Sequence, residues 1–147
     1  FFFSQAFQVL IKYDPVALKK RGEHRQKLDF ETLLEVEKKD ATIENIIARN
    51  YTFQNLNQLN KAYKEWLGID VRNILYKKKK IGRSVTFLEN RISEIIEYRH
   101  GIIHHFAIDR SLTKEGYVHM LETIEKGIEE FILFVEKKYN FKMDEHA

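Results

Sequence analysis

The chain has 147 residues, of which 44% are hydrophobic and 13% aromatic, enough to form a core and to exclude the disordered class. It contains no cysteine, which excludes disulfides, thiolate metal sites and a cysteine nucleophile and is compatible with the cytoplasm, where we expect the protein. The net charge of +3 is too small to argue for nucleic-acid binding, and no apolar run approaches the roughly 20 residues of a membrane span.

The first part of the sequence predicts a series of amphipathic helices. Apolar residues recur at helical spacing over residues 1–13, about 26–39, 43–50 and 52–67. The first helix starts at Phe1 rather than at a methionine, so we expect its N-terminus to be truncated. Asp14 and Pro15 predict a short second helix to about residue 20, because aspartate caps a helix and proline suits its first position. Thr52 is the expected cap of the helix over 52–67, and Gly68 is expected to end it.

The second part predicts two longer helices. Residues 70–82 are less regular, and Ser84 is the expected cap of a central helix that continues to Phe106. Thr113 then caps a last helix with apolar residues at helical spacing from Tyr117 to Val135. Because no alternating strand pattern competes, the sequence predicts an all-α fold. We expect a single domain over residues 1–147, a helical bundle with antiparallel long helices and short connecting helices.

The candidate functional residues gather in the sequence EYRHGIIHHF, residues 97–106. Arg99 falls inside an apolar stripe that continues through Ile102 and Ile103, so the pattern predicts a guanidinium on a buried face. A buried arginine needs a carboxylate, a phosphate or carbonyl groups in place of its lost hydration. His100 and His104 are four residues apart and share one face of the same helix.

This stretch resembles the motif of HEPN domains, which are all-helical bundles. Their metal-independent ribonucleases carry an arginine, a polar residue, three further residues and a histidine, here Arg99, His100, Gly101, Ile102, Ile103 and His104. The resemblance covers mainly residues 84–139, more faintly residues 42–70, and His105 also fits a form of the motif that is one residue longer. It implies an endoribonuclease of a toxin or phage-defence system that needs no cofactor, acts on RNA and completes its site across a homodimer.

The residue types fit that chemistry. Cleavage of RNA without a metal needs a group that takes the proton from the 2′-OH, a group that protonates the departing oxygen, and positive charge on the transition state. Histidine can transfer the protons at neutral pH, and the planar fork of arginine can hold two phosphate oxygens. We therefore expect Arg99 and His104 to be catalytic and His100 and His105 to support them. The expected RNA contacts are the nearby cations Lys77, Lys78, Lys79, Lys80 and Arg83.

Other interpretations of the same residues stay open. Arg99 could form a structural salt bridge with Glu94, Glu97 or a carboxylate on the last helix. The lysine run could be a solvated loop, and the acidic residues of the last helix most simply form its outer face: Glu122, Glu125, Glu129, Glu130 and Glu136.

Two other function classes also fit. The chain could be an inactive HEPN-like binding or dimerisation module, with an antitoxin or a fused effector domain as its partner. Alternatively, His100 and His104 could bind a metal, with a third ligand from His24, His119 or a glutamate.

Overall fold

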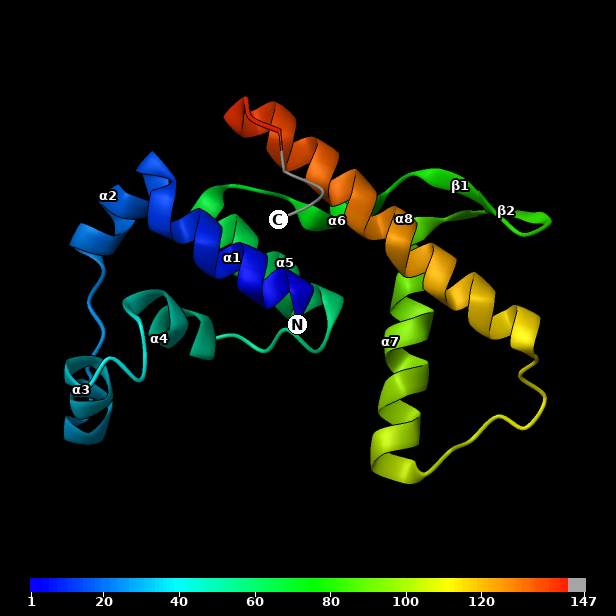
Figure 1. Cartoon of the computed structure of the whole chain (residues 1–147), viewed down its shortest axis with the longest axis horizontal. Coiled ribbons are helices and arrows are strands. Elements are labelled where there is room, and N and C mark those ends of the chain that lie inside the picture. The colour runs from blue at the N-terminus through cyan, green and yellow to red at the C-terminus, as the bar shows by residue number, and fades with distance from the viewer. Residues whose placement is uncertain (143–147) are drawn as a thin grey trace. The chain divides into compact units, whose positions relative to one another are not determined.

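The computed structural model describes residues 1–142 and is mostly helical (Figure 1). The elements of this part are α1 (Phe2–Tyr13), α2 (Pro15–Glu23), α3 (Phe30–Glu37), α4 (Ile43–Arg49), α5 (Leu56–Leu67), α6 (Val71–Leu75), β1 (Lys78–Ile81), β2 (Ser84–Phe87), α7 (Leu88–His105) and α8 (Lys114–Tyr139). They belong to two compact units, Phe1–Asp70 and Val71–Ala147. No helix in the described part combines the length and the apolar character that crossing a membrane requires. The single HEPN-like domain expected over the whole chain stays a prediction.

The first unit is built around aromatic residues of α1 and α5. Phe7 and Tyr63 are fully buried, and their ring centroids lie 5.4 Å apart. The Tyr63 hydroxyl donates a hydrogen bond of 2.7 Å to the carbonyl of Phe3, so the buried phenol is satisfied. α1 also contacts α2 and α4, which enclose this core.

The helix boundaries follow most of the expected capping residues. Asp14 and Thr113 cap α2 and α8 through their side-chain oxygens as expected, and Thr42 caps α4 in the same way. Gly68 ends α5 in the left-handed conformation, with φ of 65°. The expected cap at Thr52 is wrong, because the cap of α5 is Asn55, three residues later, whose side chain accepts from the backbone N–H of Gln58.

The second unit consists of α6, α7, α8 and a β-hairpin, and its core lies where the helices cross. Gly127 of α8 allows this close approach, because a Cβ built there would lie 2.6 Å from Cδ1 of Ile92 on α7. Leu75, Leu88 and Phe131 are buried in the same unit. Beyond this crossing, α7 and α8 diverge toward the loop that connects them (Figure 1).

The hairpin corrects two expectations. The lysine run forms most of β1, and Ser84 begins β2 instead of capping the central helix, which starts at Leu88. The strands are antiparallel with Lys78 opposite Phe87 and Ile81 opposite Ser84, so two residues make the turn. Gly82 is the first of them and has φ of 60°, which suits the tight connection of a hairpin. The fold is therefore largely, but not purely, helical.

Candidate active site

The motif residues lie on the last two turns of α7, and all of them are exposed: Arg99, His100, His104 and His105. The expected burial of this face is wrong, since the buried residues of α7 are Leu88 and Glu89 at its beginning. The close crossing with α8 lies at Ile92, and the motif residues follow about two helical turns or more beyond it. The guanidinium of Arg99 therefore keeps its hydration and needs no buried partner to replace it.

Arg99 has none of the carboxylate partners that the sequence suggested. Glu94 instead forms an ion pair with Arg91, at 2.8 Å, and Arg99 takes part in none of the ion pairs found among residues 1–142. An exposed guanidinium without a carboxylate partner retains its full set of donors for an anionic ligand.

His100 and His104 are brought together by the helix. Their ring centroids are 4.1 Å apart and the rings are inclined at 42°, as expected for residues one turn apart. No group of three possible metal ligands occurs in the described part of the chain. His119, one of the suggested third ligands, lies instead against the hairpin turn at Gly82 and 3.8 Å from Glu115. The pair is thus presented to solvent as two adjacent imidazoles.

The end of α7 is apolar and exposed. Phe106 terminates the helix in the left-handed conformation, with φ of 51°, and the N–H of Ala107 donates to the carbonyl of Gly101 in a Schellman-type closure. Phe106 is 85% exposed, and Ile103 and Ile108 beside it are 50% and 68% exposed. An apolar cluster next to charged residues is typical of a surface that binds a partner.

The hydroxyl of Tyr98, near the end of α7, is buried and has no hydrogen-bond partner in the described part of the chain. Loss of solvent around its hydroxyl raises the pKa of Tyr98, and the neighbouring Tyr117 hydroxyl on α8 acts in the same direction. The backbone of Asp109, in the loop, also lies close to this hydroxyl.

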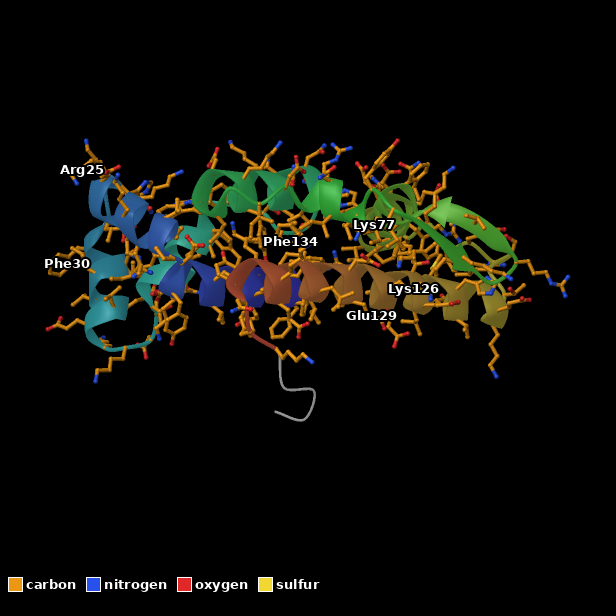
Figure 2. All side chains as sticks on the ribbon, turned by 90° about the horizontal axis from the view of Figure 1, so that it is seen from above. Arg25, Phe30, Lys77, Lys126, Glu129 and Phe134 are labelled. Atoms are coloured by element: carbon orange, nitrogen blue, oxygen red, sulfur yellow. The ribbon has the colours of Figure 1, made fainter. Side chains whose placement is uncertain are left out.

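The predicted RNA-binding cations fall into two sets. Lys77 and Lys79 both form ion pairs with Glu130 of α8, and Figure 2 shows Lys77 beside that helix. Hydrogen bonds from the two lysines lower the pKa of Glu130. Lys78 and Lys80 are exposed, as is Arg83 in the turn. The solvated-loop interpretation of the lysine run is wrong, because the run is a paired strand.

Glu130 is the residue whose role the sequence did not reveal. Its expected place on the outer face of α8 is wrong, since it is 8% exposed and faces β1. Its partner Lys77 is 53 residues away in the chain, and helical spacing alone could not reveal so distant a contact.

Comparisons with protein-family models, with curated proteins and with solved structures found no match to this chain. The HEPN resemblance consequently depends on the motif residues of α7 and on the chemistry they can perform.

Proposed function

We propose that the chain is a metal-independent endoribonuclease of the HEPN type, acting in the cytoplasm as a toxin or phage-defence effector. One observation carries the proposal. Arg99 and His104 are exposed together on the last two turns of α7, and Arg99 has no carboxylate partner in the described part of the chain. A cation and an imidazole presented to solvent within the last two turns of a helix suit a phosphodiester substrate.

The proposed reaction uses these groups in an ordinary transesterification. One histidine takes the proton from a ribose 2′-OH while that oxygen attacks the adjacent phosphorus. The bond from phosphorus to the 5′-oxygen breaks, and a second histidine gives that oxygen a proton. The products are a 2′,3′-cyclic phosphate and a 5′-hydroxyl. Arg99 stabilises the negative charge that develops on the phosphorus-bound oxygens.

The proposal includes a homodimer, because the HEPN resemblance implies that two copies of the motif complete one site. A symmetric dimer formed through the exposed end of α7 would supply His104 from each copy to one site. The same contact would cover Ile103, Phe106 and Ile108, which this chain leaves exposed. We also propose that the helices have the topology of a HEPN-like bundle, with the motif on the penultimate helix.

A second candidate is an inactive HEPN-like module that binds a partner, such as an antitoxin or a fused effector domain. The apolar cluster at the end of α7 favours this second candidate, because such a cluster can form a protein interface even when the histidines are not catalytic. Both candidates use this interface, but only the ribonuclease cleaves RNA.

Cleavage of RNA by the full chain in EDTA distinguishes these candidates. The ribonuclease proposal predicts that cleavage persists in the chelator and that the upstream product ends in a 2′,3′-cyclic phosphate. Intact RNA would favour the binding module. Cleavage that stops in EDTA and returns with added divalent metal would contradict the mechanism and favour a metal site at His100 and His104.

A further inference from the structure

The outer face of the β-hairpin differs from the face that packs on the protein. Along β1, Lys79 is half-buried and Ile81 buried, whereas Lys78 and Lys80 are exposed, the alternation of a strand with one covered face. Lys79 reaches Glu130 and Ile81 is 5% exposed, so these two mark the inner face. Lys78 and Lys80 therefore share the outer face.

Aromatic side chains share the outer face with the lysines. Lys78 is paired with Phe87 across the hairpin, and its ammonium lies 5.2 Å from the centre of the Phe87 ring. Tyr76, just before the strand, stacks on Phe87 with ring centroids 4.6 Å apart and planes inclined at 15°. Tyr76 is nevertheless 59% exposed, so much of its surface remains accessible.

This surface carries an excess of positive charge. The twelve residues 76–87 contain five cations and no carboxylate. Lys77 and Lys79 are engaged by Glu130, which leaves Lys78, Lys80 and Arg83 on the exposed part of the hairpin. This surface therefore presents three cations beside a stacked aromatic pair.

The hairpin is also held in place. Its base is fixed by the two ion pairs to Glu130 and by a backbone hydrogen bond of 2.9 Å from Leu88 N–H to the Lys77 carbonyl. Its turn approaches His119 of α8 at Gly82. Ordering the surface for a ligand consequently costs little conformational entropy.

We propose that this outer face, formed by Tyr76, Lys78, Lys80 and Phe87 with Arg83 at the turn, binds a single-stranded segment of RNA. The lysines contact phosphates, and a base stacks on Tyr76 to extend the Tyr76–Phe87 stack. Cations that follow the backbone and aromatic rings that receive bases are the features shared by surfaces that bind single strands. The inference rests on the proposed function, since it names the surface that holds the RNA substrate.

Binding can be measured separately from cleavage. The probe is a short, labelled 2′-O-methyl RNA, which lacks the attacking hydroxyl, and the readout is fluorescence anisotropy with the full chain at several salt concentrations. For Lys78→Gln/Lys80→Gln, we expect weaker binding and a salt slope smaller by about 0.7 for each lost phosphate contact. Lys137→Gln/Lys138→Gln, which removes two exposed lysines near the end of α8, is the matched control and should leave the slope unchanged.

The aromatic contact distinguishes RNA from a generic acidic partner. Tyr76→Ala should weaken binding about 5- to 150-fold, the loss of one base stack, whereas Tyr76→Phe should bind like the wild type. Circular dichroism checks that each variant folds. Polyglutamate should compete poorly, because it offers charge without bases.

Three outcomes would overturn the inference: an unchanged affinity and slope in the hairpin variants, an equal loss in the Lys137/Lys138 control, or a Tyr76→Ala variant that binds like the wild type. If one of these outcomes is found and the wild type still cleaves RNA, the ribonuclease proposal stands without this binding surface. Hairpin-dependent binding without cleavage would support the binding surface and contradict the ribonuclease.

Discussion

Glu130 holds the lysine strand against α8, because one nearly buried carboxylate accepts from both Lys77 and Lys79. An ionised carboxylate in that position is stable only while its partners are present. The two lysines remain partly exposed, at 51% and 36%, which limits what the pairs contribute to stability.

We predict that Glu130→Gln lowers the free energy of unfolding at neutral pH by about 1–2 kcal/mol, near the lower end for hydrogen bonds to a charged group. The pKa of Glu130 is lowered in the folded state from its ordinary value of 4.5. The stabilisation of the fold by ionised Glu130 is therefore complete above that value and is lost as the pH falls through the folded-state pKa.

Urea unfolding at neutral and acid pH measures this effect. The difference between wild type and Glu130→Gln should shrink in acid. Glu129→Gln is the matched control, because Glu129 is the adjacent residue on α8 and is exposed (Figure 2). An equal loss in both variants, or a difference that is independent of pH, would contradict this role of Glu130.

At the residue scale, the sequence could predict which residues share one face of a helix. The four-residue separation of His100 and His104 predicts their shared face, and the structure confirms it. It could not predict the exposure of Arg99, because an apolar stripe does not reveal where the partner helix diverges from it. The same limit applies to Glu130, whose partners lie in another element.

At the scale of elements, the hairpin depends on its turn. Gly82 has φ of 60°, and a Cβ there would clash with the His119 ring. We predict that Gly82→Ala destabilises the fold by at least about 1–2 kcal/mol, the cost of a left-handed conformation for a residue with a side chain.

Gly22→Ala provides the control for this prediction. Gly22 lies in α2, and no atom lies within 4 Å of a Cβ placed there, so the change should be neutral or stabilise by up to about 1 kcal/mol. Thermal unfolding followed by circular dichroism compares the two variants. A Gly82→Ala variant as stable as the wild type would show that the turn tolerates another conformation.

Most helices were predictable because their apolar period is a local signal, whereas α6 lies in the segment that was expected to be less regular. The hairpin was not, since lysine occupies both faces of β1 and so hides the alternation that identifies a strand. Gly82 within a two-residue turn, followed by the β-branched Val85 and Thr86, was the signal that could have revealed it.

At the scale of the whole molecule, the proposed site requires a second copy of the chain. We predict that the full chain is a dimer by light scattering at tens of micromolar, and that Phe106→Asn weakens the dimer. Asparagine suits the left-handed position at the end of α7, so the change removes the exposed ring without straining the helix end.

The matched control is Phe30→Asn, because Phe30 is also strongly exposed, at 76%, but lies in the first unit (Figure 2). It should leave the proposed dimer unchanged. A monomeric wild type, or a dimer unaffected by Phe106→Asn, would contradict the interface. A single sequence could not define the proposed site, because the proposal takes half of it from a second copy of the chain.

The most direct test is the rate of RNA cleavage in EDTA by point variants of the full chain. We predict that His104→Ala loses a factor of about 10² to 10⁴, the usual contribution of proton transfer, and that Arg99→Ala loses about 10² to 10³. His105→Ala should lose less than His104→Ala. The controls Arg25→Ala and His24→Ala, which remove exposed residues of the same types, should cleave normally. Wild-type cleavage by folded His104→Ala would contradict the mechanism.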